Sequence, residues 1–575
     1  MGPHNRLLSM ICLAGLLLGI VGFSAGSTSA ASFPPQKSRV GMVLSSHPIA
    51  NEVGMRVLEE GGNAVDAAVA VGYTLAVVLP AAGNLGGGGF AVIHMAEGDT
   101  VALDFREVAP GKATRDMYLD DKGNVVPNAS TEGFLAAGVP GTVAGMSAML
   151  ERYGTRSLAQ LIVPAIDYAE SGYVVGPGQA ESFAANAKRF RSYTSARKYF
   201  LKPDGTPYKE GEIFAQKDLA KTLRLIAADG AAAFYEGPIA DMISNDMAAK
   251  GGLITKSDLA KYTPVWRNPV RGTYRGYEVV SMCPPSSGGI HIVQILNILE
   301  GYDLQSMGFG SSSAVHVMAE AMRYAYADRS EFLGDPDFVK VPTAGLTSKN
   351  YAAEIRSKIS LERATPSSEV KPGTPWQHEG TNTTHYSIVD KYGNAVAVTY
   401  TINGSYGCGE AIEGAGFLMN NEMDDFSIKP GVPNLYGLVG GDANAVEPYK
   451  RPLSSMSPTM VFSDGRLFMV LGSPGGARII TTVLQVILNA IDHKMDIREA
   501  VDAPRIHMQW VPDEIRIENR GLSKDVESKL KAMGHNVVVR APMGDVNAIL
   551  VDPATGILYG AGDSRNRDMV PSFNY

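Results

Sequence analysis

Cysteine is scarce in this sequence, because its 575 residues contain only three. Cys12 lies in an N-terminal apolar run, so a mature chain that has lost this run keeps only Cys283 and Cys408. Small exported domains often depend on several disulfides, whereas a chain of this length can bury a core that is stable without them. The sequence therefore predicts no structural disulfide.

Clustered positive charge is also lacking. The formal net charge is -8 at pH 7, and no block of lysine and arginine stands out. This composition gives no indication of a nucleic-acid partner and suits a small diffusible substrate better than a polyanion. The ten histidines are scattered, with no i,i+4 pair and no cysteine cluster, so neither a metal site nor a cofactor is predicted.

An apolar run long enough to cross a membrane is missing from the N-terminal region. Residues 11–23 are apolar, but these 13 residues fall short of the roughly 20 that span a bilayer. Arg6 precedes the run and small residues follow at positions 28–30, which is the pattern of an export signal. A membrane anchor is the alternative interpretation. We expect residues 1–30 to be a signal peptide, the protein to be exported to the periplasm or otherwise secreted, and no stable anchor to remain.

A glycine-rich run at residues 83–89 (GNLGGGG) raises the question of a nucleotide-binding loop. A dinucleotide fingerprint follows a strand and opens a helix. Here a helix is predicted before the run, at residues 64–78 with Asn63 as its N-cap, and a strand follows at residues 90–95. The helix contains one charge, Asp66, and should be buried on most sides. The glycines are therefore predicted to be structural, allowing tight turns or close backbone approach.

Helical spacing dominates the middle of the chain. The segments that show it are residues 141–153, 158–170, 217–228, 239–250, 290–299 and 314–332. Ser286 and Ser287 precede one of these helices, but no Gly-x-Ser-x-Gly pattern surrounds them, so a rigid turn is predicted there. Arg106 ends an apolar strand at residues 101–105, and taken alone it would be a solvated strand-end arginine. One large α/β core is compatible with this pattern.

The chain changes character at residues 361–382 (LERATPSSEVKPGTPWQHEGTN). This segment is polar, contains three prolines and two glycines, and has no period of 2 or 3.6. Residues 384–390 and 395–402 then alternate as strands do. A flexible loop is thus predicted to lead into Thr383 at the start of a strand. The segment is either a linker between domains or a cleavage point that turns Thr383 into a new N-terminus.

The turn between the two strands defines a partner for Thr383. Asp390 at the start of the turn and Gly393 near its end suit a three-residue hairpin loop with the glycine in the left-handed region. A hairpin centred on Tyr392 pairs residues whose numbers sum to 784, so Thr383 faces Thr401, within one residue if a bulge is present. The alternative is an ordinary cross-strand pair of threonines. A free amine at Thr383 would have a pKa of about 7.7–8.0 and could serve as the base for its own hydroxyl.

Four motifs in this order resemble the γ-glutamyltransferase (γ-glutamyl transpeptidase) family of N-terminal-nucleophile hydrolases. They are residues 383–387 (TTHYS), 421–427 (NEMDDFS), 451–458 (RPLSSMSP) and 472–476 (GSPGG). The resemblance implies an α/β (α+β) fold, a four-layer αββα sandwich shared by two self-cleaved subunits. It also implies cleavage between Asn382 and Thr383, which gives a heterodimer of a large subunit, residues 31–382, and a small catalytic subunit, residues 383–575. Thr383 is then the nucleophile and Thr401 its hydrogen-bonding partner.

The same resemblance implies roles for further residues. A γ-glutamyl group carries a carboxylate, which suits an arginine and hydroxyl donors, and an ammonium, which suits carboxylates and amide oxygens. The positions that match the family for the carboxylate are Arg106, Ser454 and Ser455. Those for the ammonium are Asn403, Glu422 and Asp425. Those for the oxyanion are Gly475 and Gly476. Residues 433–444 resemble a lid loop that closes with Tyr436.

The activity implied is transfer of the γ-glutamyl group of glutathione to water or to an amino acid or dipeptide acceptor, without a cofactor. Three alternatives remain open. A cephalosporin (glutaryl) acylase has less need of Glu422 and Asp425, because a glutaryl group lacks the ammonium. A polyglutamate-cleaving relative suits a lid and Arg106 less well. An exported solute-binding protein would stay a single intact chain, whereas two fragments divided at Thr383 exclude it.

Overall fold

The structure is a computed structural model that describes residues 33–373 and 384–569. The predicted signal peptide, Asn382 and Thr383 lie outside the described residues. The chain divides into two units, residues 1–34 and 35–575, and the fold described below belongs to the second. Among the described helices none combines the length and the apolar character that crossing a membrane requires.

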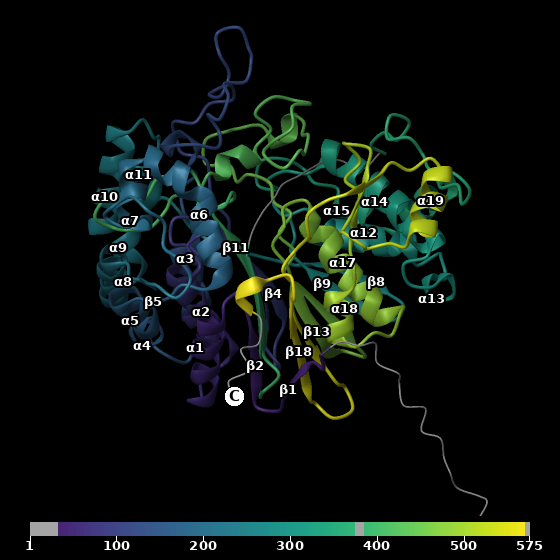
Figure 1. Cartoon of the computed structure of the whole chain (residues 1–575), viewed down its shortest axis with the longest axis horizontal. Helices are drawn as coiled ribbons and strands as arrows, with labels where there is room; N and C mark the ends of the chain where they lie inside the picture. Colours follow the sequence, from purple (N-terminus) through teal and green to yellow (C-terminus); the bar gives the residue numbers. More distant parts are fainter. Residues whose placement is uncertain (1–32, 374–383, 570–575) are drawn as a thin grey trace, which may run out of the picture. The chain divides into compact units, whose positions relative to one another are not determined.

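Two antiparallel sheets form the centre of this unit (Figure 1). The six-stranded sheet has the order β2 (Gly41–Leu44), β10 (Thr384–Asp390), β11 (Ala395–Thr401), β3 (Gly88–His94), β4 (Thr100–Phe105) and β7 (Val265–Arg267). The seven-stranded sheet has the order β1 (Gln36–Ser38), β18 (Leu558–Gly562), β17 (Asn547–Val551), β13 (Arg466–Gly472), β12 (Thr459–Ser463), β9 (Tyr277–Ser281) and β8 (Val270–Tyr274). Two small sheets contain β14 (Ile506–His507), β15 (Ile515–Ile517) and β16 (Val537–Val539), and β5 (Tyr173–Val174) and β6 (Ile213–Phe214).

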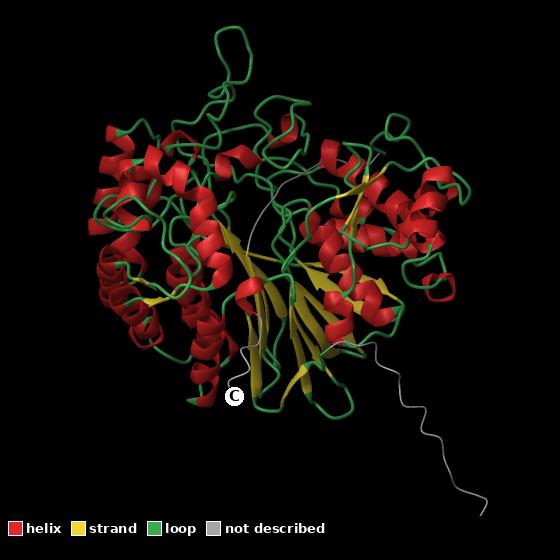
Figure 2. Ribbon diagram, viewed as in Figure 1, coloured by secondary structure: helices red, strands yellow, loops and turns green. Residues whose placement is uncertain are grey.

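The two large sheets face each other, with helices outside both (Figure 2). Val92 of the six-stranded sheet and Val470 of the seven-stranded sheet belong to one buried apolar cluster between them. Helices α1 (Pro48–Glu59), α2 (Ala64–Val78) and α3 (Thr142–Tyr153) lie on the side of the six-stranded sheet. Helices α12 (Gly288–Leu299), α17 (Arg478–Ile491) and α18 (Ile497–Asp502) lie on the side of the seven-stranded sheet. The α/β class predicted from the sequence is confirmed.

The remaining helices extend these outer layers. They are α4 (Leu158–Leu161), α5 (Val163–Ser171), α6 (Pro177–Ser192), α7 (Thr194–Phe200), α8 (Lys217–Asp229), α9 (Ala231–Tyr235), α10 (Pro238–Ala249), α11 (Lys256–Ala260), α13 (Leu304–Met307), α14 (Ser312–Phe332), α15 (Thr343–Leu346), α16 (Lys349–Lys358) and α19 (Lys524–Ala532). The predicted helix at residues 158–170 is two helices, α4 and α5. Pro164 stands at the start of α5, where a missing N–H costs nothing, whereas inside one continuous helix it would remove a hydrogen bond.

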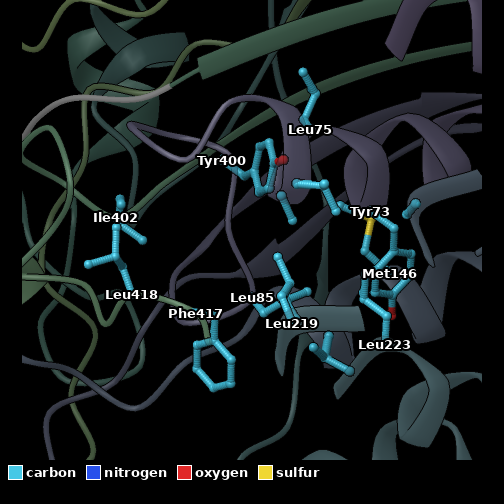
Figure 3. Close-up of a cluster of buried hydrophobic side chains, with 14 of the residues drawn as sticks. Tyr73, Leu75, Leu85, Met146, Leu219, Leu223, Tyr400, Ile402, Phe417 and Leu418 are labelled. Carbon is cyan, nitrogen blue, oxygen red and sulfur yellow. The ribbon is translucent and has the colours of Figure 1, made fainter. Parts of the chain in front are cut away.

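Helix α2 is the buried helix that the sequence predicts. All of its residues are buried, and Asn63 and Asp66 form a capping box at its start. The Asp66 carboxylate also accepts hydrogen bonds from the backbone N–H and the hydroxyl of Thr155, at 2.8 and 2.6 Å, which explains a charge inside the protein. Tyr73 of α2 and Tyr400 of β11 belong to the apolar cluster that joins this helix to the six-stranded sheet (Figure 3).

The glycine-rich run is structural, as predicted, and its role is close approach. A Cβ at Gly87 would lie 1.9 Å from the carbonyl oxygen of Thr401, and one at Gly86 would lie 2.2 Å from that of Leu418. No glycine of residues 83–89 has a positive φ, so these residues are chosen for lack of volume and not for a turn conformation. The run follows α2 and leads into β3, which is not the context of a dinucleotide loop.

The described part of the predicted flexible loop, residues 361–373, is anchored to the body of the protein. It contains no helix or strand, in agreement with the sequence pattern. However, the N–H of Ser367 donates to Asp513 at 2.7 Å, and the N–H of Gly373 donates to Asp328 of α14 at 2.8 Å. These contacts to the body of the protein were not predicted, because the partners are distant in sequence and leave no local pattern.

Candidate functional site

The hairpin of β10 and β11 has the predicted register. Thr384 pairs with Tyr400 and Val389 with Ala395, so that paired residue numbers sum to 784. Gly393 has a φ of 89°, the left-handed conformation predicted for the turn. Thr383, the next residue before β10, lies outside the described residues, and its pairing with Thr401 remains a prediction.

Thr401 ends β11 and is held rigidly. Its side chain is buried, and its hydroxyl oxygen accepts a hydrogen bond from the N–H of Asn403 at 2.8 Å. Its carbonyl accepts from Asn84 Nδ2 at 2.9 Å, which fixes the strand end against the glycine-rich run. Because the hydroxyl oxygen accepts from the backbone, its proton is left to be donated to another group.

Asn403 offers an acceptor. Its φ of 67° is unusual for a residue other than glycine. Its Nδ2 donates to the carbonyl of Asn421 at 2.9 Å, which aims the Oδ1 atom away from that contact. This Oδ1 is buried and has no hydrogen-bond partner among the described residues. A buried amide oxygen without a donor is costly unless a ligand supplies one.

Arg106, Glu422 and Asp425 form one buried ion cluster. The Arg106 guanidinium donates to Glu422 through Nη1 and to Asp425 through Nη2, the latter at 2.5 Å. Its Nε and Nη2 also donate to the carbonyls of Pro452 and Leu453, at 3.0 and 2.9 Å. Arg106 is therefore not a solvated strand-end residue, since none of its surface is exposed. The structure brings together the residues predicted for the carboxylate and for the ammonium of the ligand, and these residues bind one another.

Glu107 belongs to the same cluster and was missed by the sequence analysis. Its carboxylate lies 3.7 Å from the Arg106 guanidinium, and neither oxygen has a hydrogen-bond partner in the described part of the chain. Burial raises the pKa of Glu107, although the charge of Arg106 opposes this. Burial likewise raises the pKa of Glu422 well above its usual range. One sequence signal could have identified Glu107: it is a second charged residue directly after Arg106 at the end of an apolar strand.

Ser454 and Ser455 lie directly after the two carbonyls that hold Arg106, and both are fully buried. The Ser454 hydroxyl accepts from the N–H of Met456 at 3.1 Å, and the Ser455 hydroxyl accepts from the guanidinium of Arg329. Arg329 lies in α14, and no sequence pattern predicts that it reaches this loop. Both serines therefore have contacts within the protein, and their predicted contact with a ligand carboxylate is untested.

The predicted rigid turn before α12 packs against the same loop. Ser287 donates to the carbonyl of Ser454 through its N–H at 2.7 Å and its hydroxyl at 2.9 Å. The Ser286 hydroxyl donates to the carbonyl of Met456 at 2.6 Å and accepts from the N–H of Gly288 at 3.0 Å. These serines support the loop of Ser454 and Ser455.

Gly475 and Gly476 join β13 to α17. Their φ values are 139° and 65°, both in a region that favours glycine. Their carbonyls accept from the N–H groups of Arg478 and Ile479, whereas their own N–H groups donate to no other group among the described residues. Two adjacent free N–H groups can stabilise a developing negative charge.

His385 is buried beside this loop and is not available as a base. Its ring nitrogens lie 2.9 Å from the hydroxyl of Thr399 and 2.8 Å from that of Ser387. Burial lowers its pKa to about 3, so the ring is neutral. A Cβ on Gly472 would lie 2.4 Å from the ring, which shows how closely β10 and β13 approach.

The predicted lid, residues 433–444, borders the same cavity as the glycine loop. The N–H of Leu435 donates to the Asp424 carboxylate at 2.9 Å. Leu435 and Tyr436 line a cavity of about 200 Å³ together with Gly475. Gly437 has a φ of 78°, as a turn within such a loop requires. The predicted lid and the predicted oxyanion loop therefore share one cavity.

One group of potential metal ligands lies elsewhere in the described residues, formed by His316, Glu320 and His535. The two imidazoles lie 2.7 Å apart, and His316 also lies 2.6 Å from the carbonyl of Ser360. Glu320 pairs with Arg323 at 3.2 Å. These contacts make the cluster part of a hydrogen-bond network, in which His535 Nδ1 has no partner among the described residues.

The chain is similar to proteins of one known family. The family model described as Gamma-glutamyltranspeptidase matches residues 50–572. The chain is 54% identical over 537 residues to the glutathione hydrolase proenzyme of Escherichia coli (strain K12), an alignment that covers 93% of this chain and 92% of that protein. It is 52% identical to the glutathione hydrolase proenzyme of Pseudomonas sp. (strain A14), over 93% of this chain and 94% of that protein.

Solved structures agree with this family. The crystal structure of cephalosporin acylase from Bacillus halodurans matches with a TM-score of 0.84 at 29% identity, covering 95% of this chain and 98% of that chain. The crystal structure of Helicobacter pylori gamma-Glutamyltranspeptidase matches with a TM-score of 0.59 at 58% identity, covering 61% of this chain and 100% of that chain.

Proposed function

Because the chain belongs to the gamma-glutamyltranspeptidase family, we propose that it is a γ-glutamyltransferase and glutathione hydrolase made as a self-cleaving precursor. The cut lies between Asn382 and Thr383, and Thr383 becomes the nucleophile. The observation that carries this proposal is the hairpin register, which pairs Thr384 with Tyr400; the proposal extends this register by one residue, to Thr383 and Thr401. The Thr401 hydroxyl is already oriented by the N–H of Asn403.

The reaction follows from these positions. The Thr383 hydroxyl attacks the γ-glutamyl carbonyl carbon, and the free amine of the same residue takes the hydroxyl proton. The N–H groups of Gly475 and Gly476 stabilise the negative oxygen. The C–N bond breaks, the proton passes to the departing amine, and Cys-Gly leaves. Water or an acceptor amine then attacks the γ-glutamyl ester and regenerates Thr383.

The ion cluster accounts for selection of a γ-glutamyl group. Arg106 binds Glu422 and Asp425 in the structure, so the groups proposed for the two charges of the ligand are paired with one another before a ligand enters. A ligand with both a carboxylate and an ammonium replaces these contacts by two of the same kind, its carboxylate on Arg106 and its ammonium on the two acids. Asn403 Oδ1 supplies a further acceptor for the ammonium, and Ser454 and Ser455 add hydroxyls for the carboxylate.

A glutaryl acylase is the second candidate, favoured by the structural similarity to a cephalosporin acylase. A glutaryl group brings a carboxylate without an ammonium, so it would leave Glu422 and Asp425 buried without a cation once Arg106 is taken. Leaving a buried charge without its partner costs about 3–5 kcal/mol. The γ-glutamyl substrate is therefore the better match.

The proposal extends to the architecture of the mature enzyme. Residues 31–382 and 383–575 form its large and small subunits, and both contribute strands to the αββα sandwich of the N-terminal-nucleophile type. The pair is a heterodimer from one precursor and needs no cofactor. In this proposal residues 1–30 direct export to the periplasm.

A Thr383→Ala variant tests the proposal, with Thr384→Ala as the matched control in the next residue. We expect Thr383→Ala to stay one uncut chain without activity, and Thr384→Ala to give two fragments. A gel with N-terminal sequencing measures cleavage, and glutathione consumption with and without a dipeptide acceptor measures activity. A cut and active Thr383→Ala protein would refute the mechanism, and a wild type that stays intact would favour a solute-binding protein.

A further inference from the structure

The cavity beside Gly475 has a basic wall. Besides Gly475 and the lid residues Leu435 and Tyr436, its lining includes Arg478 at the start of α17, Gln509, and Arg516 of β15. Among the described residues, no acidic side chain lines it. A concave site with two guanidiniums and no carboxylate is arranged for an anion.

Arg478 carries a charge that the protein does not balance. Its Nε donates to the carbonyl of Gly475 at 2.9 Å, and no carboxylate in the described part of the chain forms an ion pair with it. Burial, and next the like charge of Arg516, lowers the pKa of Arg478. Arginine remains protonated in proteins, so Arg478 keeps a buried positive charge without a carboxylate partner, which is unfavourable for the folded protein.

Arg516 is balanced only in part. Its Nε donates to Glu514 at 2.9 Å, but the same carboxylate also binds Arg540 at 2.8 Å. One negative charge is thus shared by two guanidiniums, and a net positive charge remains on this wall. The Arg516 side chain is 17% exposed, so the charge is only weakly screened by water.

We propose that Arg478 and Arg516 bind the terminal carboxylate of the peptide part of the substrate, in the Cys-Gly that leaves and in the dipeptide that accepts. This inference rests on the proposed function, because Gly475 must lie at the reacting carbonyl. Two extended residues span roughly 7 Å, and Gly475 and both arginines line this one cavity. A dipeptide whose amine lies at Gly475 therefore places its carboxylate at the arginines, where bidentate contacts form.

The lid and the anion wall are also connected. Gln509 is buried, and its Nε2 donates to the carbonyl of Gly437 in the lid loop at 3.3 Å. Its Oε1 lies 2.9 Å from His507 Nε2, which holds the amide in place. A ligand carboxylate between the arginines and Tyr436 is thereby covered by the lid.

The test compares two donors in one enzyme. Glutathione has the terminal carboxylate, whereas γ-glutamyl-p-nitroanilide has none. We expect Arg516→Gln to lower kcat/KM for glutathione, relative to that for the anilide, by about 10- to 100-fold, as for the loss of charge-assisted hydrogen bonds. Arg540→Gln is the matched control, because Arg540 shares Glu514 but does not line the cavity, and it should change the ratio much less than Arg516→Gln does. The ratio does not depend on how much enzyme is folded.

A second measurement uses the acceptors glycylglycine and glycylglycinamide, which differ in the terminal carboxylate. The wild type should prefer the acid, and Arg516→Gln and Arg478→Lys should lose this preference. An unchanged donor ratio in Arg516→Gln, or an equal fall in Arg540→Gln, would overturn the assignment. A wild type inactive on both donors would instead overturn the proposed function, and the site with it.

Discussion

Substitution of Gly87 by alanine should stop self-cleavage while leaving the protein folded. The added Cβ would lie 1.9 Å from the carbonyl oxygen of Thr401 and 2.7 Å from Asn84 Oδ1. Neither neighbour can yield alone, because Asn84 Nδ2 donates to this same Thr401 carbonyl. Gly87 is itself fixed, since its carbonyl accepts from the N–H groups of Gly141 and Thr142 at 2.7 and 3.0 Å.

The size of the effect follows from the overlap. Real Cβ atoms are essentially never closer than 3.0 Å to another heavy atom, so the end of β11 must retreat by roughly 1.1 Å from the 1.9 Å contact. A displacement of about 1 Å at a reacting group can cost on the order of 100-fold in rate. The strain itself should cost about 1–3 kcal/mol, which lowers the melting temperature of a chain this long by only a few degrees.

Cleavage is followed on denaturing gels after synthesis, and folding by thermal denaturation. Gly98→Ala is the matched control, because the nearest atom to its Cβ would be 3.6 Å away, and this variant should be cut at the wild-type rate. If Gly87→Ala were cut as fast as Gly98→Ala, the position of Thr401 would not control the reaction, and the argument from the hairpin would be refuted.

Two further predictions concern the charges of the site. Lysine at position 106 cannot make the paired contacts of Arg106 to Glu422 and Asp425, so Arg106→Lys should lose about 3–5 kcal/mol of unfolding free energy, measured in urea, and should raise KM for glutathione. The control Arg115→Lys changes a side chain that is 33% exposed and should do neither. Burial raises the pKa of the Asp424 carboxyl from 3.8 to about 6, so the folded state holds the carboxyl proton more tightly than the unfolded state does. The folded state should therefore lose stability as the pH rises through that range, by at most about 3 kcal/mol. In Asp424→Asn this contribution is absent, and urea midpoints at pH 4 and pH 7 should show a smaller decline than in the wild type; equal declines would contradict it.

What the sequence predicted correctly was mostly local. The register of the β10–β11 hairpin follows from the turn at Gly393 and from alternation on either side, so a few residues determine it. Helix α2 and its cap at Asn63 follow from the same kind of pattern. Local patterns could not predict which distant residues lie together. The family motifs did predict such a group, and the structure places two of its members, Arg106 and Glu422, in contact.

What the sequence could not supply were contacts between distant segments. Arg329 reaches Ser455 from the middle of α14, and Glu107 joins an acid cluster whose other members are more than 300 residues away. The anchoring of residues 361–373 depends on Asp328 and Asp513, which no local composition relates to that segment. Polar anchors of this kind depend on tertiary geometry and leave no periodicity in the chain.

The order of the strands has a consequence for a chain cut at residue 382. In one sheet β10 pairs with β2 and β11 with β3, and in the other β18 pairs with β1 and β12 with β9. Four ladders thus join the two fragments, and none can be released without opening a sheet. The processed enzyme should therefore show no dissociation on dilution and no exchange of fragments between molecules while it is folded, whereas its melting temperature should depend on concentration, because unfolding separates the fragments. Once unfolded, it must rebuild both sheets from two separate chains, a step that the intact precursor never faces.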